Sequence, residues 1–205
     1  MKQVVKITVL FFISIVSVHS VQAQLHLNLT YNLAMPQGAD FRDHINNTSL
    51  RGWQGSLLYD INDNFRVGLQ TSYNDFYQKH PRQVYKSTDG ADVSTVLSNS
   101  LQMEPVFAKG EYSFLKTGFL RPYIGLGAGV NFADYRQFQG AYGYSTMYTK
   151  AAFTGDAGVL IPIGKNSDRY GVRINTSYNY LPFHQEGINN LNSWNVGAGI
   201  VIPLR

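Results

Sequence analysis

The stretch from Arg121 to Phe132, RPYIGLGAGVNF, restricts the possible fold more than any other part of the chain. Its even-numbered positions from Ile124 to Phe132 are all apolar, whereas Gly125, Gly127 and Gly129 occupy odd-numbered positions. A period of two places these two sets on opposite faces of a β-strand. Glycine weakens an ordinary strand and offers nothing to pack. The pattern therefore favours a strand whose bare face looks into a narrow, crowded barrel and whose apolar face meets a nonpolar solvent such as lipid.

Further segments alternate in the same way, so the chain is predicted to form about eight strands. The other strands are expected at Gln24–Met35, Ser49–Tyr59, Phe65–Asp75, Ser100–Phe114, Tyr148–Ile161, Tyr170–Tyr180 and Asn192–Leu204. Each is near or above the ~9–11 residues with which a tilted strand crosses a bilayer. In Ser100–Phe114, the outward face is expected to hold Leu101, Met103 and Phe107, opposite Glu104. A change of phase near Lys109 indicates a β-bulge in this strand.

The connections between the strands alternate in length. Long loops are expected at Pro36–Asn47, Phe76–Asn99, Asp134–Met147 and Leu181–Leu191, and short connections at Asp60–Asn64, Leu115–Leu120 and Ile163–Arg169. Outer-membrane barrels have short periplasmic turns and long external loops. The sequence therefore predicts an all-β fold, an up-and-down antiparallel transmembrane β-barrel with both termini on the periplasmic side.

The N-terminal segment has the pattern of a secretory signal peptide. Lys2 and Lys6 form a short positive region, Ile7–Val18 is mostly apolar, and Val21-Gln22-Ala23 offers a cleavage site. The apolar run is shorter than the ~20 residues that a membrane-spanning helix needs. We therefore expect residues 1–23 to be removed and residues 24–205 to form the exported barrel domain.

Composition excludes several classes of protein. Charged residues make up only 15% of the 205 residues, which is low beside the roughly 25% usual for soluble domains. The chain has no cysteine, so a disulfide framework or a thiolate metal site is excluded. The net charge of +4 includes Lys2 and Lys6 of the expected signal peptide, and no basic run remains elsewhere. The charge therefore gives no support for binding to nucleic acid.

Alternation alone leaves two orientations open, because a soluble lipocalin-like carrier has the same period with its apolar face turned inward. The polar faces here carry mostly Asn, Gln, Ser, Thr and Gly, whereas the outside of a soluble barrel needs many more charges. Aromatic residues also gather near the strand ends, as in the two interfacial girdles of a membrane barrel. The expected girdle residues are Tyr59, Phe65, Phe114 and Tyr170 at the turns, and Tyr73, Tyr148, Tyr178 and Tyr180 at the loops. We therefore expect the apolar faces to point outward.

Four charged residues are then expected inside the barrel. They are Arg66, Glu104, Asp156 and Arg173. Because buried charges need partners, we expect ion pairs among them, Asp156 with Arg173 in particular. An eight-stranded barrel leaves an interior just wide enough for side chains, which favours a structural plug over a selectivity or gating element. The interior glycine face is expected to comprise Gly125, Gly127, Gly129, Gly197 and Gly199.

With the Arg121-Pro122-Tyr123 motif and its alternating glycines, the expected signal peptide and the loop rhythm, the chain resembles the small outer-membrane β-barrels of the OmpX/OmpA membrane-domain and OmpW types. The resemblance spans about Gln24 to Arg205. It implies a protein that is adhesion-related, structural or a porin-like conduit for small or hydrophobic solutes. It also implies a monomer whose partners are outer-membrane lipid, lipopolysaccharide and the barrel-insertion machinery. Members usually end on an aromatic residue, whereas this chain ends Ile202-Pro203-Leu204-Arg205.

Residues that could support catalysis or metal binding do not form a recognisable motif. The Gly125–Gly129 stretch lacks the lysine of a phosphate-binding loop. His44, His80 and His184 fall in separate expected loops without tight ligand spacing, so no metal site, cofactor or catalytic set is predicted.

The sequence therefore favours a non-enzymatic integral outer-membrane barrel, structural or passively conducting. Two alternatives stay open: a soluble ligand carrier, and a surface adhesion barrel that acts through its external loops. For the latter, Tyr135, Phe138, Tyr142, Tyr144 and Tyr148 could form an aromatic contact surface.

Overall fold

The computed structural model describes residues 25–86, 92–115, 117–140, 142–163, 170–185 and 187–204. The expected signal peptide lies outside these residues. Eight strands close into an antiparallel barrel in the order β1-β12-β9-β8-β7-β6-β3-β2, as the sequence predicted. Their bounds are β1 Leu25–Pro36, β2 Ser49–Asp60, β3 Phe65–Lys79, β6 Leu97–Ser113, β7 Arg121–Gln139, β8 Tyr142–Pro162, β9 Gly171–Tyr180 and β12 Ser193–Leu204. The first and last strands pair along their whole length, from Leu25 opposite Leu204 to Pro36 opposite Ser193, and this seam closes the barrel.

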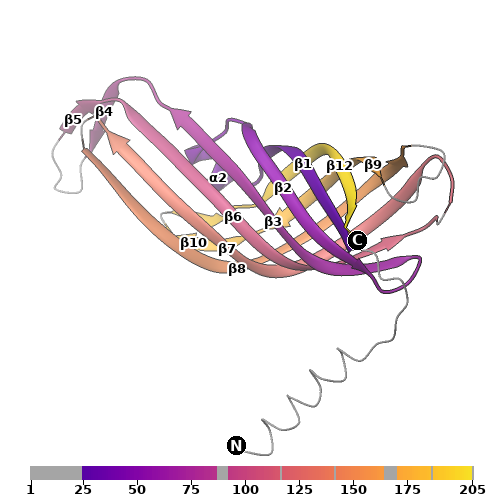
Figure 1. The fold of residues 1–205 in the computed structure, drawn as a ribbon. Helices are drawn as coiled ribbons and strands as arrows, with labels where there is room; N and C mark the ends of the chain where they lie inside the picture. The colour runs from indigo at the N-terminus through magenta and orange to yellow at the C-terminus, as the bar shows by residue number, and fades with distance from the viewer. Residues whose placement is uncertain are drawn as a thin grey trace, which may run out of the picture.

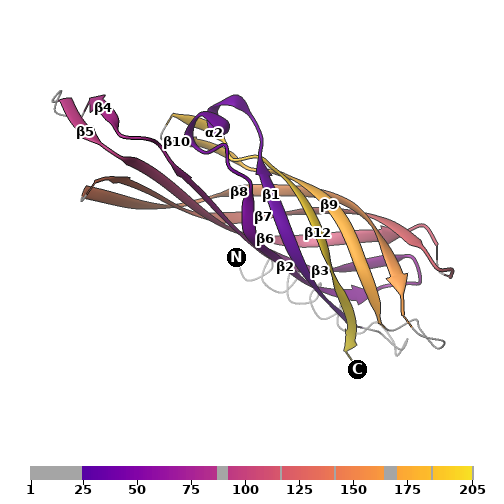
Figure 2. The same cartoon turned by 90° about the horizontal axis from the view of Figure 1, so that it is seen from above.

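The strands differ in length, so the wall is taller on one side. Strands β3, β6, β7 and β8 run beyond the others at the loop end, where the hairpin of β4 (Gln83–Lys86) and β5 (Asp92–Thr95) extends further (Figures 1 and 2). The short helix α2 (Ala39–His44) and the hairpin of β10 (Pro182–Gln185) and β11 (Ile188–Asn190) lie over the mouth at the same end. No helix within the described ranges is long and apolar enough to cross a membrane.

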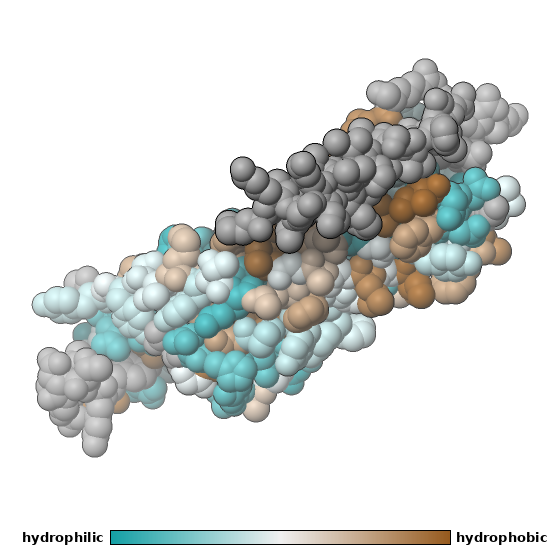
Figure 3. Space-filling view, turned by 90° about the horizontal axis from the view of Figure 1, so that it is seen from below, coloured by the Kyte–Doolittle hydropathy of each residue, from teal (hydrophilic) through white to brown (hydrophobic). Residues whose placement is uncertain are grey.

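The barrel is polar inside and apolar outside along its lower half. On β9, Arg173 and Asn175 are 2% and 3% exposed, whereas Ile174 between them is 51% exposed. The same alternation holds on β1, where His26, Asn28, Thr30 and Asn32 are buried. On the face seen in Figure 3, hydrophobic residues gather toward one end and hydrophilic residues toward the end that carries the β4–β5 hairpin. This orientation is the opposite of that of a soluble ligand carrier, so that alternative is wrong.

The loop expected at Asp134–Met147 is instead a continuous hairpin. Strands β7 and β8 pair from Arg121–Leu160 up to Gln139–Tyr142, and the chain turns at Gly140 with a φ of 63°. The segment reads as a loop because its hydrophobic alternation stops where polar residues occupy both faces. Its Tyr, Phe and Thr residues nevertheless favour an extended backbone.

The other expected long loops also contain regular structure. Part of Phe76–Asn99 extends β3 and forms β4 and β5, Pro36–Asn47 contains α2, and Leu181–Leu191 contains β10 and β11. The short connections at Asp60–Asn64 and Leu115–Leu120 lie between consecutive strands as expected, with residue 116 outside the described residues. Most of the third expected short connection, Ile163–Arg169, also lies outside the described residues. Short turns at one end and larger insertions at the other follow the predicted rhythm, except after β7.

The expected β-bulge near Lys109 is wrong. Strand β6 keeps one register with β7 throughout, from Leu97 opposite Gln139 to Ser113 opposite Tyr123. Its pairing with β3 keeps one register too and is interrupted only around Pro105, which has no N–H to donate to the ladder. A register shift occurs instead between β1 and β2, at Asn32 and Ala34.

Candidate functional site

A buried ionic cluster fills the interior toward the turn end of the barrel. It consists of Lys109 and Glu111 from β6, Asp156 from β8 and Arg173 from β9. The Lys109 ammonium lies 2.8 Å from Oδ1 of Asp156, and the Arg173 guanidinium donates to Oε2 of Glu111 at 2.7 Å and to Oδ2 of Asp156 at 3.3 Å. Each of these side chains is at most 3% exposed. Strands β6, β8 and β9 therefore join their charges across the lumen rather than along the wall.

Further polar groups extend the cluster toward the turns and toward β2. Arg66 contacts Oε1 of Glu111 at 3.5 Å and donates to Oδ1 of Asp60 at 2.8 Å. Asp60 in turn lies 2.9 Å from the His26 ring nitrogen. On the other side, Lys109 donates to Oε1 of Gln70 at 2.9 Å. The carboxylates Asp60, Glu111 and Asp156 thus match the cations Arg66, Lys109 and Arg173, so these paired groups carry no net charge.

An aromatic ring supports the cluster from β7. The Arg173 guanidinium carbon lies 3.8 Å from the centroid of the Tyr123 ring, within the range of a cation–π contact. Tyr123 is 2% exposed and belongs to the motif that opens the glycine-rich strand. The Arg121-Pro122-Tyr123 motif therefore contributes to the structure, because its tyrosine ring packs against one face of the Arg173 guanidinium.

The sequence identified three members of this interior network and misplaced a fourth. Arg66, Asp156 and Arg173 lie on the interior side, and Asp156 pairs with Arg173 as expected. The interior position expected for Glu104 is wrong, because Glu104 is exposed on the outer face of β6 between buried Met103 and Pro105. The alternation of β6 predicts its apolar face on the outside, but in the upper half of the strand the interior side is apolar.

Lys109 and Glu111 were the members that sequence reasoning missed. Both occupy odd-numbered positions of β6, on the same side as buried Leu101, Met103 and Phe107. The signal was present as an unbroken period of two from Leu101 to Glu111, which joins an apolar run to a charged one. The switch from apolar to charged residues on one face of β6 resembles a switch of face. This resemblance accounts for both the wrong β-bulge near Lys109 and the wrong interior position of Glu104.

Of the predicted interior glycines, Gly125 lies against the same cluster, and the other four lie against neighbouring side chains or backbone. A Cβ atom on Gly125 would come within 2.6 Å of Oδ1 of Asp156 and 2.8 Å of Cε of Lys109. On Gly127 it would lie 2.9 Å from the Thr154 methyl group, and on Gly197 2.6 Å from the Thr30 methyl group. The remaining members, Gly129 and Gly199, face the backbone carbonyl oxygens of Val106 and Leu29 more closely still. At Gly125 and Gly197 an interior side chain would be in the way of a Cβ atom, whereas at Gly129 and Gly199 the backbone of the neighbouring strand would be.

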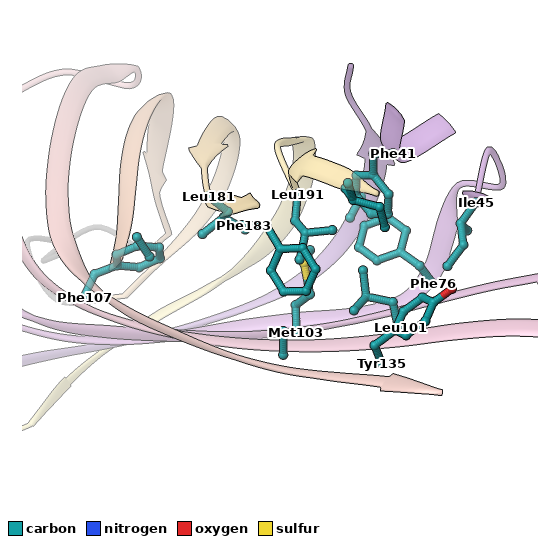
Figure 4. Packing of buried hydrophobic residues seen from close by; sticks show 14 residues of the cluster. Phe41, Ile45, Phe76, Leu101, Met103, Phe107, Tyr135, Leu181, Phe183 and Leu191 are labelled. Atoms are coloured by element: carbon teal, nitrogen blue, oxygen red, sulfur yellow. The ribbon is translucent and has the colours of Figure 1, made fainter. Parts of the chain in front are cut away.

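A hydrophobic cluster closes the opposite, loop end of the lumen. Its largest fully buried members are Phe41, Ile45, Phe76, Leu101, Met103, Phe107, Tyr135, Leu181, Phe183, Ile188 and Leu191. Figure 4 shows Phe41 and Leu191 of the cap facing Leu101 and Met103 of the wall. Phe41 packs edge-on against Phe76 at 5.3 Å between ring centroids. The cap and the upper wall thus form a core like that of a soluble protein.

Hydrogen bonds hold the cap segments to each other and to the wall. The Gln37 N–H donates to the Asn192 carbonyl at 2.8 Å and links the two cap segments. Asn189 donates to the Asp40 carboxylate at 2.5 Å, and Asn99 of β6 donates to the His44 carbonyl at 3.1 Å. The cap is therefore tied to the barrel by polar contacts at its rim and by apolar packing at its centre.

The expected girdle residues lie on the outer surface with one exception. Tyr59, Phe65, Phe114, Tyr170, Tyr178 and Tyr180 are exposed, and Tyr73 is half-buried on the outward side of β3. The assignment of Tyr148 to the outer girdle is wrong, because it packs against the interior hydrophobic cluster and contacts Phe183 edge-on at 4.9 Å. Tyr148 lies in the extended part of β8, where parity places it on the inner face.

Two histidines in the cap region, His44 and His80, make contacts that account for them structurally. The His44 ring bonds to the Asp40 carbonyl at 2.8 Å, and the His80 ring lies 3.4 Å from the His44 carbonyl. His184 is exposed in β10, with a φ of 54°. The described residues contain no group of three or more His, Cys, Asp or Glu side chains placed to hold a metal ion.

Comparisons with known proteins place the fold. No family model and no curated protein matches the sequence. Among solved structures, Neisserial surface protein A (NspA) aligns with a TM-score of 0.56 at 15% identity, over 88% of this chain and 96% of that one. OprG from Pseudomonas aeruginosa aligns with a TM-score of 0.54 at 12% identity, over 89% and 96%. The chain therefore has the fold of the small eight-stranded outer-membrane β-barrels.

Proposed function

We propose that the protein is an integral outer-membrane barrel with a closed lumen, and that it is structural rather than conducting or enzymatic. The observation that carries the membrane assignment is the exposed apolar band around the lower barrel, with residues such as Leu69 and Leu126 61% and 74% exposed. A soluble monomer rarely leaves a continuous apolar surface of this kind in water. The band lies on tilted strands between two groups of aromatic residues, as lipid-facing surfaces of barrels do.

The filling of the interior supports a closed barrel over a conduit. A solute would have to pass the hydrophobic cluster under the cap and then the ionic cluster below it. Separating the buried ion pairs would leave charges such as Glu111 and Arg173 unpaired, at a cost of several kcal/mol for each ion. The matched charges also leave no surplus field to attract an ion of either sign. A conducting state would therefore require both blocks to rearrange together.

Fractionation of cells that express the full chain tests this proposal. We expect the protein in the outer-membrane fraction, beginning at Gln24 by N-terminal sequencing, with a folded form that migrates differently on gels before and after heating. In planar bilayers we expect no steady single-channel conductance. Recovery as a soluble periplasmic protein would remove the membrane assignment. Steady conductance would instead leave the membrane assignment intact and replace the structural role by a conduit.

A second candidate, interaction with another protein at the cell surface, is favoured by the free edge of β8. Strand β8 pairs with β9 only from Phe153 onward, so residues 142–152 pair with β7 on one side and with no described strand on the other, although β10 lies close to β8 through the contact of Tyr148 with Phe183. The Phe114 N–H donates to the Pro122 carbonyl, and the Ile163 N–H donates to the Tyr170 carbonyl. These two bonds determine which residues of each strand direct their backbone groups toward which neighbouring strand. By this pattern, the odd-numbered residues of β8 direct their N–H and C=O groups toward the open edge.

The open edge also has few of the usual features that prevent pairing. Residues 142–152 read YGYSTMYTKAA, which contains no proline and one charge, Lys150. Natural edge strands are commonly protected by charges, prolines or bulges. An extended segment of another protein could therefore add to β8, with backbone bonds giving affinity.

Substitution of Met147 by proline tests the edge. Met147 is 72% exposed, and its N–H points away from β7, so proline removes an edge donor without breaking the β7–β8 ladder. Peptides selected from a displayed library on the membrane-embedded protein are expected to lose binding to Met147→Pro and to keep binding to Val84→Ala. Peptides that bind both variants equally would argue against strand addition.

A further inference from the structure

The outer wall of the barrel carries a groove that the closed lumen does not explain. It has two parts of about 330 Å³ and 440 Å³, which share Ala157 of β8 and Thr176 of β9 and so form one elongated depression. The upper part reaches Tyr178 and Trp194, and the lower part reaches Ile161 near the turns. Both volumes are within the ~300–1,000 Å³ typical of small-molecule sites.

The floor of the groove is formed by small side chains on β8. Gly155 and Ala157 lie side by side on the outward face, flanked on β7 by Ile124 and Leu126. Leu126 is 74% exposed and forms a ridge along one margin of the groove. In the upper part of the groove, the absence of large side chains at Gly155 and Ala157 of β8, rather than a break in the sheet, therefore makes the depression.

Gly155 is not required by the backbone or by crowding. A Cβ atom there would meet only Cδ2 of Leu126, at 3.6 Å, an ordinary contact distance. The interior Gly125 differs, since a Cβ atom there would come within 2.6 Å of Asp156. The outward Gly55 and Gly110 differ in another way, because the rings of Trp53 and Phe65 cover them at 3.5 Å and 3.4 Å. Gly155 is an outward glycine that no ring covers, so the wall keeps an open space where a side chain would fit.

We propose that this groove binds an acyl chain of a membrane lipid, with the polar end of the chain beside Tyr178 and Trp194. The proposal rests on the membrane assignment above. A flexible chain can follow a narrow floor between ridges, whereas a second convex barrel would touch the ridges at Leu126 and Ile174 and leave the floor empty. The two rings are 5.9 Å apart and lie at the loop end of the groove. Tyr and Trp there offer an apolar body to the chain and a hydrogen-bond donor to its ester group.

The two tryptophans of the chain allow a direct test. Trp194 lies at the groove and Trp53 lies on β2, away from it, and they are 43% and 49% exposed. Two single-tryptophan proteins, Trp53→Phe and Trp194→Phe, are reconstituted in phosphatidylcholine bilayers with a minority of lipid brominated on its acyl chains. We expect the bromine to quench Trp194 more strongly than Trp53, because an acyl chain stays in the groove for a longer time than it stays on the open wall.

Filling the groove should abolish the difference. In a Gly155→Leu background the ratio of Trp194 to Trp53 quenching is expected to fall. The matched control is Ala108→Leu, which changes an outward small residue of β6. In this control the quenching ratio should equal that of the protein with Gly155. Heat-dependent gel migration verifies that each variant is folded.

The outcomes separate this inference from the membrane assignment. Equal quenching of both tryptophans in the unchanged groove would overturn the lipid site and leave the barrel in the membrane. Quenching of neither would overturn the membrane assignment itself. Weaker quenching of Trp194 than of Trp53 would overturn the lipid site in favour of a protein partner, including a second copy, over the groove.

Discussion

Replacing Arg173 by methionine is expected to lower the free energy of unfolding by about 3–5 kcal/mol, the usual cost of removing one partner from a buried ionic network. The guanidinium donates to Glu111 at 2.7 Å and to Asp156 at 3.3 Å, and its bond to Glu111 is shorter than the 3.8 Å contact that Lys109 makes with the same carboxylate. Without it, two carboxylates share a buried space with Lys109, which lies 3.8 Å from Glu111. The variant also removes the cation from the Tyr123 ring.

Unfolding in urea, followed by the fraction of protein that keeps folded gel migration, measures this effect. The matched control is Arg51→Met, because Arg51 is 81% exposed and its contact with Asp75 at 3.4 Å should contribute almost nothing. Equal midpoints for the two variants would show that the interior cluster does not stabilise the barrel.

Removing a whole pair should cost less than its single changes suggest. In Lys109→Met with Asp156→Leu, the charges that lie 2.8 Å apart disappear together, so the double variant leaves fewer unpaired ions than Asp156→Leu alone. A buried pair replaced by apolar residues of similar volume is often close to neutral. A double variant that loses the full sum of the two single losses would argue that the pair is not coupled.

The lower barrel could be predicted from sequence because one physical rule operates there with few exceptions, such as the buried inward residues Leu58 and Val201. Lipid-facing apolar residues alternate with lumen-facing polar residues, as at Arg173, Ile174 and Asn175, so the period and the face of most residues follow from the pattern. The pairing of Asp156 with Arg173 followed from the same rule, since buried charges at similar heights need each other.

The upper barrel could not be predicted in the same way because the solvent changes along one strand. On β6, the interior side is charged at Glu111 and apolar at Met103, while the outer side turns polar at Glu104. Judged by polarity alone, the inner and outer faces of β6 therefore exchange places along the strand. Whether the interior side is polar or apolar depends on what fills it, and the cap that fills it comes from residues far away in the sequence, such as Phe41 and Leu191.

The long hairpin of β7 and β8 shows a second limit. Above the apolar band both faces of these strands can be polar, and the periodic signal disappears although the ladder continues from Phe132 to Gln139. The Asp134–Arg136 ion pair on the outer face, supported by Ser145 of β8, is part of this continuation. The β7–β8 ladder therefore continues above the apolar band in the same register, without an alternation of polar and apolar residues to mark it.

Gly199 is expected to be the glycine position at which a small change has the largest effect on assembly. Its inward face lies against the backbone carbonyl of Leu29 across the β1–β12 seam that closes the barrel. Gly199→Ala would place a methyl group on that oxygen, and backbone cannot move aside as a flexible side chain could. We expect a loss of more than about 3 kcal/mol, at or above the upper end for overpacking, and little folded protein after refolding into lipid vesicles.

The matched control for this change is Gly155→Ala, on the outer face of β8. There a methyl group has room, at 3.6 Å from Leu126, and the loss of glycine freedom in the unfolded chain should leave stability unchanged or raised by about 0.4–1 kcal/mol. The comparison isolates the direction in which the missing side chain would point, because both positions carry the same substitution in a barrel strand. If both variants refolded with equal yield, close approach of the Leu29 backbone could not be the reason for glycine at position 199. If only Gly199→Ala failed, the approach of the neighbouring strand on the inward side would be the constraint that selects glycine there, while the outer face remains free to use an open space for lipid.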